Sequence, residues 1–595
     1  MHDTSHKAPV WAMRYLLFIA GMGGLLYGID IGIIAGALPY LESTASVAWK
    51  LTAQQLSFIV AAVLLGSVLS SLFAGALADI LGRRWVMFLA GALFSASIPL
   101  IALADGYTPL LLGRLLQGIS GGLIGVVVPL YLAECLPAQQ RGRGAALFQL
   151  LLTIGLVAAA LIGLQQAQTV ETATQAAQAL PEAGRIAAIF TAKDHAWRSI
   201  FWVCLTPGLV FTIGALLLAE SPRWLAQRGR IEQARQSLLR TRLPAAADIE
   251  LREMQDTPEN AAKISGKARD PLLSRRYVLP FLLACLILAC TQATGINSIL
   301  AYVVNILNQA GLSGASANMA DVLLKVLNAV MTVVAVLLVD RKGRKFLLML
   351  GTGGIVVSLL AAGLLFRSAE AHLADVRPAI AAQVQADGLA LQLDAPTLTA
   401  LGAAADGTPQ QLTIAYAYGP FTNVKSLRSD NPVLRQVSIA RDDAVQADSV
   451  IGAFFRKLHL NPFADPAAGR EAPLRIEKAS LGPVPSSSHG WLVAIAICVF
   501  VSSFAVGPGV CVWLALSELM PTRIRSNGMS IALLVNQFVS TVIAAIFLPT
   551  VGLHGYSTLF FFGAGCTVLY FLAAAFLLPE TKGKTLEEIE AHFSK

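Results

Sequence analysis

Twelve long apolar stretches, separated mostly by short polar segments, dominate the pattern of this sequence. A helix needs about 20 apolar residues, at 1.5 Å per residue, to cross the ~30 Å hydrocarbon core of a bilayer. Twelve stretches meet this length, and an even number of spans leaves both ends of the chain on one side of the membrane. We therefore predict an all-α membrane protein with spans at about 15–40, 55–78, 85–104, 109–133, 144–165, 198–219, 278–304, 319–339, 346–366, 490–516, 527–549 and 555–578.

The basic residues between these spans predict which side faces the cytoplasm, because short cytoplasmic loops retain Lys and Arg. If the N-terminus lies inside, the cytoplasmic segments hold 27 of the 44 lysines and arginines. Of the remaining 17, 11 lie in one long segment, where this rule is weak. We therefore expect both termini in the cytoplasm, as in a multi-pass protein of a bacterial inner membrane.

The composition agrees with lipid surroundings and narrows the class of protein. Hydrophobic residues make up 55% and charged residues 13%, with a mean hydropathy of +0.65, whereas a soluble chain is about a quarter charged. Because basic loops explain the net charge of +8, no nucleic-acid partner is expected. The seven cysteines lie in or beside apolar stretches and the eight histidines in termini or loops, so we predict neither a disulfide framework nor a metal site. The short polar start at 1–13 shows no cleavage site, and we expect the first helix to be retained.

Three charged motifs occur twice, once in each half of the chain. The pairs are 79–84 with 340–345, 134–141 with 518–525, and Glu220 with Glu580. Their offsets are 261, 384 and 360 residues. The difference 384 − 261 implies an insert of 123 residues between spans nine and ten, and the fall to 360 implies 24 extra residues between spans five and six. The chain is therefore predicted to contain two parallel six-helix repeats that face the same way.

The repeat divides the chain into four parts and two inserts. The parts are a first bundle (1–220, with an external insert at about 166–197), a cytoplasmic linker with surface helices (221–276), a second bundle (277–582, with an external insert at about 367–489) and a tail (583–595). Alternating runs that start at Gln411 and at Leu474 indicate short strands in the longer insert. This insert is either a small folded subdomain or a mobile loop.

The ordered set of motifs resembles the major facilitator superfamily and, within it, the sugar porter family. The set comprises the paired D-x-x-G-R-[RK] loops, Gly113-Arg114, Glu220-Ser-Pro-Arg-Trp224, Val339-Asp-Arg-Lys-Gly-Arg344 and Pro579-Glu-Thr-Lys-Gly-Lys584. The resemblance covers nearly all of the chain except the inserts. The family includes bacterial xylose–proton symporters and animal facilitative glucose carriers, and it implies two pseudo-symmetric six-helix bundles, the major facilitator fold.

Carboxylates and arginines cluster at the predicted cytoplasmic ends of both halves. Such pairs can hold helix ends together in one state and separate in another, which suits a switch between states a few kcal/mol apart. Basic residues between spans also serve topology alone, whereas the acidic partners favour the switch. The candidates are Asp79, Arg83, Glu134, Arg141, Glu220 and Arg223 in the first half, and Asp340, Arg344, Glu518, Arg525 and Glu580 in the second.

Ionisable residues inside the bilayer are costly and point to function. Asp30 in span one and Arg114 in span four both lie in the outer half of the membrane. A carboxylate whose arginine partner moves away could take up a proton. In the resemblance, Asp30 matches the protonated carboxylate of the symporters and Arg114 its partner. The alternative is a static structural ion pair.

Uncharged amides and one indole are the candidate sugar ligands. Asn and Gln both donate and accept hydrogen bonds, as sugar hydroxyls do, and a flat aromatic ring covers the apolar face of a sugar. Glycines in spans seven and ten indicate broken helices, where carriers bind their substrates; interhelical hydrogen bonding is the alternative role for each amide. In the resemblance, the sugar-contact positions are Gln149, Gln292, Asn297, Asn328, Trp513 and Gln537.

The sequence departs from the family pattern where Thr291 and Leu156 replace glutamines and Ala301 replaces a tyrosine. The expected function is import of a monosaccharide, a hexose or pentose, together with H⁺ by alternating access. A facilitative sugar, polyol or cyclitol carrier, a drug exporter and a non-transporting sugar receptor are the alternatives. We expect a monomer in the lipid bilayer, with no cofactor, no metal and no enzymatic activity.

Overall fold

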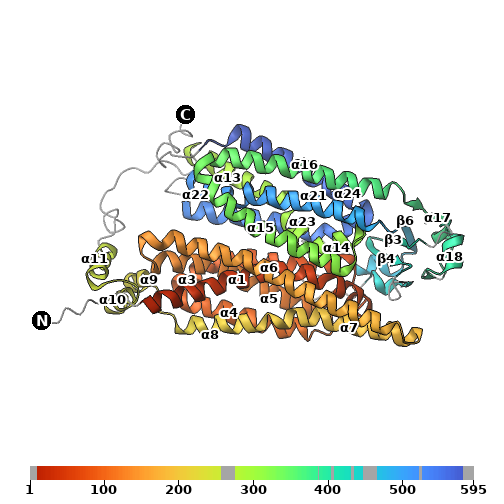
Figure 1. The fold of residues 1–595 in the computed structure, drawn as a ribbon, viewed down its shortest axis with the longest axis horizontal. Coiled ribbons are helices and arrows are strands. Elements are labelled where there is room, and N and C mark those ends of the chain that lie inside the picture. Colours follow the sequence, from red (N-terminus) through yellow and green to blue (C-terminus); the bar gives the residue numbers. More distant parts are fainter. Residues whose placement is uncertain are drawn as a thin grey trace.

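Two helical bundles lie side by side, one from each half of the chain (Figure 1). The computed structural model describes residues 10–255, 275–385, 387–403, 408–430, 435–445, 465–520 and 525–580. Within these residues, twelve helices are long and apolar enough to cross a membrane, which confirms the predicted all-α fold of twelve spans. We call the end of the bundles that carries α9–α11 the linker end, and the opposite end, which carries the strands, the insert end (Figure 1).

The first bundle is built from six spans, and the helices of the fifth and sixth extend furthest beyond their predicted windows. Its helices are α1 (Val10–Ser43), α2 (Ala45–Ala48), α3 (Ala53–Leu81), α4 (Arg83–Ala102), α5 (Tyr107–Cys135), α6 (Ala138–Ala177), α7 (Glu182–Val203) and α8 (Leu205–Leu217). The sixth span thus consists of α7 and α8. Thr52 caps α3, because its hydroxyl accepts from Gln55 N and the Gln55 side chain accepts from Thr52 N.

The shorter insert, predicted at about 166–197, is not a loop. α6 continues to Ala177 and α7 begins at Glu182, so the two helices form a hairpin at the insert end. The polar composition of this segment shows where the apolar stretches end. It does not show where the helices end, because a helix can continue through polar residues.

Three short helices follow the first bundle. They are α9 (Pro222–Gln227), α10 (Ile231–Leu239) and α11 (Pro244–Gln255). Their apolar faces form a small core that includes Trp224, Leu225, Leu238 and Leu251.

The second bundle repeats the first but contains two broken spans. Its helices are α13 (Arg275–Ala293), α14 (Ile296–Gln309), α15 (Gly314–Lys342), α16 (Arg344–Glu370), α21 (Ser487–Val506), α22 (Pro508–Leu519), α23 (Arg525–His554) and α24 (Tyr556–Leu572), which continues as one π-helical turn to Leu577. The seventh span breaks at Gly295, which has a left-handed φ of +83°. The tenth breaks at Gly507. The glycines in these two spans therefore mark real interruptions.

The longer insert forms a small folded unit, and both runs noted in the sequence are strands. Its strands are β1 (Ala374–Asp375), β2 (Leu389–Gln392), β3 (Gln410–Tyr418), β4 (Phe421–Arg428), β5 (Gln436–Ile439) and β6 (Leu474–Pro483), with short helices α17 (Arg377–Ala381), α18 (Ala395–Ala400) and α20 (Pro466–Arg470) and a 3-10 turn (Arg441–Asp443). An antiparallel sheet has the order β1-β6-β3-β4, and β2 pairs with β5. Alternating apolar residues of these strands form their own core.

This insert touches both bundles. Asn423 Oδ1 on β4 accepts a hydrogen bond from Ala53 N of the first bundle at 3.0 Å. On the second bundle, Gln411 Nε2 donates to Gln309 Oε1 at 2.7 Å. Lys478 Nζ donates to Leu553 O of the same bundle at 3.2 Å. The insert therefore lies across the line where the two bundles meet.

Several hydrogen bonds join the two bundles in the half nearest the insert. Among described residues, Asn305 Nδ2 donates to Glu42 Oε2 at 2.7 Å, Gln54 Nε2 to Ala545 O at 2.8 Å, and Leu548 N to Ser57 Oγ at 3.2 Å. Each of these residues lies toward the insert end of its helix. This structure is therefore closed at the insert end.

Candidate functional site

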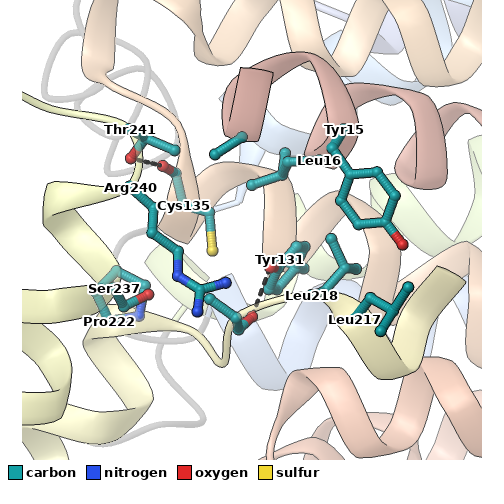
Figure 2. Close-up of a pocket in the computed structure, with 12 residues that line it drawn as sticks. Tyr15, Leu16, Tyr131, Cys135, Leu217, Leu218, Pro222, Ser237, Arg240 and Thr241 are labelled. Atoms are coloured by element: carbon teal, nitrogen blue, oxygen red, sulfur yellow. Dashed lines mark hydrogen bonds between the residues drawn. The ribbon is translucent and has the colours of Figure 1, made fainter. Parts of the chain in front are cut away.

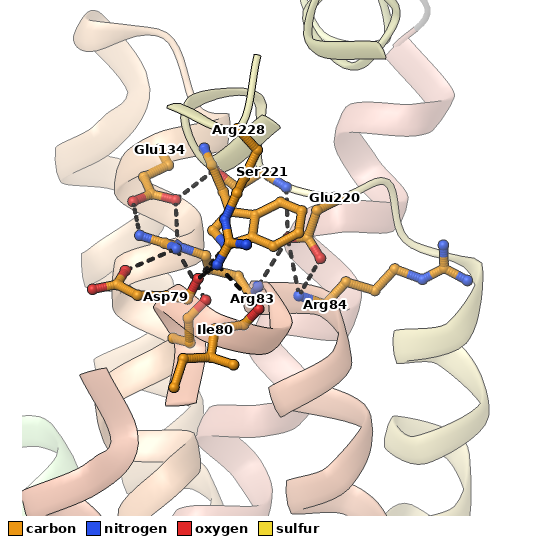
Figure 3. Close-up of polar contacts among 10 residues, drawn as sticks. Asp79, Ile80, Arg83, Arg84, Glu134, Glu220, Ser221 and Arg228 are labelled. Carbon is orange, nitrogen blue, oxygen red and sulfur yellow. Dashed lines mark hydrogen bonds and ion pairs between the residues drawn. The ribbon is translucent and has the colours of Figure 1, made fainter. Parts of the chain in front are cut away.

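A charge network joins four segments of the first bundle at the linker end (Figure 3). The buried Arg83 donates from Nη2 to Glu134 Oε1 at 2.9 Å, and its Nη1 lies 3.0 Å from Asp79 Oδ1. Glu134 also accepts from the Ser221 hydroxyl, and Trp224 Nε1 donates to Asp79 O at 2.8 Å. The structure thus brings three of the predicted residues together, and Ser221 and Trp224 tie the linker to them.

Glu220 caps the start of α4 in the same network. Its Oε1 accepts from Arg83 N at 2.9 Å and from Arg84 N at 3.2 Å. Gly82, with φ +97°, lets the carboxylate approach, since a Cβ there would lie 2.4 Å from Glu220 Oε2. Burial raises the pKa of the Glu220 carboxyl, and hydrogen bonds from the backbone of Ser221, Arg84 and Arg83 oppose that rise. The ionised carboxylate at this helix N-terminus therefore depends on these N–H donors.

The second bundle repeats this cap. Glu580 accepts from Arg344 N at 3.1 Å and from Lys345 N at 3.2 Å at the start of α16. Gly343 has φ +90°, and a Cβ on it would lie 2.6 Å from Glu580 Oε2. The pairing of Glu220 with Glu580 that the sequence offsets predicted is therefore also a structural equivalence.

Other predicted members of the network are placed less fully. Arg223 is exposed and makes no ion pair with a described residue. The side chains of Arg141, Asp340, Glu518 and Arg525 lie outside what the structure describes.

A small cavity lies beside the network, between α1, α5, α8 and α10 (Figure 2). Tyr15, Tyr131 and Arg240 are among its lining residues, and the Tyr131 hydroxyl donates to Ala219 O. Its volume of about 40 Å³ suits about one water molecule. It is too small to be the site of a sugar.

Asp30 and Arg114 both lie in the interior of the first bundle, each 1% exposed. Arg114 Nη1 donates to Gln117 Oε1 at 2.6 Å, and its guanidinium lies 5.6 Å from the centre of the Phe201 ring. Asp30 Oδ2 packs on Gly121, where a Cβ would lie 2.7 Å away, and Asp30 Oδ1 has no hydrogen-bond partner. The two charges interact through space but lie beyond the 4.0 Å of a direct ion pair. Asp30 is therefore a buried carboxylate that is not neutralised by direct contact.

Amide side chains meet at the break in the seventh span. Asn297 Nδ2 donates to Gln292 Oε1 at 3.0 Å and to Ser540 Oγ at 2.9 Å. Gln292 Nε2 donates to Asn536 Oδ1 at 3.2 Å, and Asn536 Nδ2 donates to Leu288 O at 3.0 Å. Two predicted residues, Gln292 and Asn297, thus lie together. They are joined by Asn536 and Ser540 of α23, which are not among the six predicted sugar-contact positions.

The other predicted sugar ligands do not join this cluster through direct hydrogen bonds. Gln537 lies beside Asn536 on α23, and its Oε1 is buried without a partner. Asn328 on α15 is half-buried, and Gln149 on α6 is exposed. The Trp513 side chain lies outside the described residues. Thr291, which replaces a family glutamine, donates instead to Ile287 O and to the Tyr570 hydroxyl at 2.9 Å.

No cluster of three or more His, Cys, Asp or Glu side chains that could hold a metal ion occurs within the described part of the chain. The arrangement instead offers uncharged donors and acceptors in one bundle and a buried carboxylate in the other. These groups suit reversible binding of a polyhydroxylated molecule and of a proton.

Comparisons with known proteins agree with this chemistry. The chain is 30% identical over 355 residues to the glucose transporter GlcP of Staphylococcus epidermidis, covering 60% of this chain and 72% of that protein. It is 28% identical to the human proton myo-inositol cotransporter, over 99% of this chain and 82% of that one. It is 26% identical to the galactose–proton symporter of Escherichia coli K12, over 99% and 96%.

A solved structure shares the fold. The inward open conformation of the xylose transporter XylE from E. coli matches with a TM-score of 0.62 and 19% identity, covering 98% of this chain and all of that one. The family described as "Sugar (and other) transporter" matches residues 16–381 and 476–593. The internal segment that it does not match, 382–475, is the central part of the longer insert. The protein is thus a multi-pass membrane carrier rather than an enzyme, and it belongs to the sugar porter family of the major facilitator superfamily.

Proposed function

We propose that this carrier imports a monosaccharide together with H⁺ by alternating access. The observation that carries the proton coupling is Asp30, a buried carboxylate that has one oxygen without a hydrogen-bond donor. A charge in such a place is costly unless it is paired or becomes protonated. Arg114 is close enough to favour the ionised form in one state, and its separation from Asp30 in another state would favour protonation.

The amide cluster supports the sugar site. Gln292, Asn297 and Asn536 are joined by hydrogen bonds to one another, and each can exchange these partners for sugar hydroxyls at little cost. The unpaired Gln537 Oε1 offers an acceptor to a further hydroxyl. The cluster flanks Gly295, where the broken helix gives access to the middle of the membrane.

The contacts between the bundles support alternating access. The hydrogen bonds named above join them at the insert end, so opening that end requires their exchange. In our proposal the termini and the linker helices lie in the cytoplasm and the insert lies outside, in a bacterial inner membrane, and the carrier acts as a monomer.

Thr291 favours a second substrate class. Because its hydroxyl is bound to Tyr570, the site lacks one amide of the family pattern. A cyclitol, as in the proton myo-inositol cotransporter that the chain resembles over its full length, is therefore the alternative to a hexose or pentose.

Flux into proteoliposomes tests both parts of the proposal. A panel of labelled monosaccharides and cyclitols is offered with and without an inward proton gradient, and exchange is measured separately by counterflow. We expect the gradient to drive accumulation, and Asp30→Asn to abolish accumulation while exchange continues, since only net coupled transport needs the proton. Asp248→Asn, which removes an exposed linker carboxylate paired with Arg235, is the matched control and should behave as the unmodified protein.

Two results would contradict the proposal. Equal accumulation with and without the gradient, together with normal exchange, would indicate a facilitative carrier. An absence of flux for every sugar and cyclitol would reject sugar transport by this site.

A further inference from the structure

Two charged side chains of α15, Asp321 and Lys325, are fully buried in the middle of the protein. Lys325 Nζ lies 2.7 Å from Asp321 Oδ2, one helical turn away, and the side chains are 0% and 1% exposed. They are the only charged residues of the span Gly314–Val339. Because ionisable groups within a membrane are expensive, such a pair calls for a reason beyond the stability of the helix.

Lys325 also reaches across the boundary between the bundles. Its Nζ lies 3.3 Å from Gly32 O on α1, to which it donates a hydrogen bond. Gly32 follows Asp30 by two residues, about 200° around a helix, so the carboxylate and this carbonyl lie on opposite faces of α1. The helix that carries the proposed proton site is thus held from its other face by a cation of the second bundle.

The packing around this contact is close, because glycines of α1 let α6 approach. Gly24, Gly28, Gly32 and Gly36 of α1 face α6, and a Cβ on Gly28 would lie 1.9 Å from Leu152 O. Asn318, on the same face of α15 as Lys325, has an unpaired Oδ1 that points at Gly36 and Gly163. α6 therefore packs on both α1 and α15 at the boundary between the bundles.

The two partners of Lys325 differ in how they would behave during that movement. Asp321 is on the same helix and travels with Lys325 in every state, so the ammonium is never left without a counter-charge. Gly32 O belongs to the other bundle and is lost when α1 and α15 separate. Separation of α1 from α15 therefore breaks one hydrogen bond to a neutral carbonyl and leaves the buried ion pair intact. A loss of this size suits two states a few kcal/mol apart.

We propose that Lys325, carried by Asp321, is a positioning residue that holds α1 against α15 in the state closed at the insert end and releases it when that end opens. The inference rests on the proposed alternating access for its role in transport, but the contact itself is independent of the substrate and of proton coupling. An alternative in which the pair only stabilises α15 requires no contact with α1.

Three variants separate these roles. Asp321→Leu with Lys325→Leu removes the pair. Asp321→Lys with Lys325→Asp keeps a buried i,i+4 pair but removes the donor that faces Gly32. Lys325→Arg keeps the donor. Thr332→Val is the matched control on α15, because the Thr332 hydroxyl bonds only to its own helix at Asn328 O.

The readout is the distance between spin labels at the insert end of the two bundles, on cysteines placed at the exposed Thr172 of α6 and Ser368 of α16 in a chain without its native cysteines. In the apolar and the exchanged variants we expect the ratio of closed to open populations to fall about tenfold, the weight of one hydrogen bond to a charged group. Lys325→Arg and Thr332→Val should keep the ratio of the unmodified chain. Counterflow should continue in the exchanged variant, since the contact is independent of the substrate and of proton coupling.

Other outcomes would overturn the proposal. An exchanged variant with the same distance distribution as the unmodified protein would assign the pair to helix stability alone. Loss of folding in both the apolar and the exchanged variants, with Lys325→Arg folded, would assign it to stability as well. If the unmodified protein shows no proton-driven flux but the label distances shift as expected, the proposed coupling fails while this inference stands.

Discussion

The first helix of each half carries the same short pattern, Gly-Ile followed by a polar residue, but the two helices use it differently. In α1 the pattern is Gly28-Ile29-Asp30, and the helix is unbroken from Val10 to Ser43. In the second half it is Gly295-Ile296-Asn297, and the chain breaks between α13 and α14 at Gly295. Gly28 permits a close approach of α6, whereas Gly295 supplies a left-handed backbone conformation.

The difference separates two kinds of chemistry. In an unbroken helix the backbone N–H and C=O groups bond to one another and need no further partners. Its neighbours can therefore pack tightly on α1, and this packing limits access to its one buried carboxylate. A broken helix brings side chains from both of its segments to one place, and Gln292 and Asn297 meet there with α23. The first spans of the two halves therefore hold equivalent places, but one carries a buried carboxylate and the other carries uncharged amides.

The largest effect is expected where the packing of α1 is blocked. Gly28→Leu places side-chain atoms on Leu152 O, a backbone atom that cannot move aside, and should cost more than about 3 kcal/mol. Thermal unfolding in detergent, followed by size-exclusion chromatography, should show little folded protein. Gly75→Leu is the control, since nothing lies within 4 Å of a Cβ there. A folded Gly28→Leu protein would mean that α1 does not need this contact.

The second substitution places at position 297 the aspartate that the first half has at position 30. Asn297→Asp loses the donor to Gln292 Oε1 and Ser540 Oγ and places an extra negative charge among acceptors. We expect sugar affinity to fall about 10- to 100-fold, measured by counterflow, because each broken buried hydrogen bond costs about 1–3 kcal/mol. Asn308→Asp, three turns further along α14, serves as the comparison. An unchanged affinity would remove Asn297 from the sugar site.

A smaller effect is expected from substitution of Gly295, where the seventh span breaks. Gly295→Ala meets no steric obstacle, since a Cβ would lie 3.8 Å from Ile299, but an L-residue at φ +83° costs about 1–2 kcal/mol. Sugar affinity should fall roughly fivefold to tenfold as the two segments realign. Gly295→Asn should be milder, because Asn tolerates this conformation better. Equal effects of the two substitutions would argue that flexibility, rather than the left-handed backbone, matters here.

The smallest difference between the two halves is expected at the carboxylate caps of α4 and α16, where the halves are alike. Gly82→Ala and Gly343→Ala each bring a Cβ to within 2.6 Å of a capping carboxylate at a positive φ. Both should lower the stability of the protein by a similar amount, about 1–3 kcal/mol, in thermal unfolding. A loss confined to one variant would show that the two caps are not equivalent.

The sequence predicted the general design better than the details of the site. Span lengths and motif offsets are properties of long stretches, so the twelve helices, the repeat and the position of the inserts could be read directly. The Asp321–Lys325 pair was missed because two charges among about 20 mostly apolar residues still leave a stretch that reads as a membrane span. Within Asn536-Gln537, the sequence could not decide which amide meets Asn297, since that depends on the rotation of α23.

The forty-residue α6 has a consequence beyond its packing. At 1.5 Å per residue it is about 60 Å long, roughly twice the hydrocarbon thickness of a bilayer. Because its inner part packs along the glycines of α1, its projecting part and α7 form a rigid arm of the first bundle. A small rotation of that bundle therefore becomes a large displacement at the tip between Ala177 and Glu182. A bulky domain or a fluorophore attached at this tip would therefore be displaced far enough in each transport cycle for the movement to be measured.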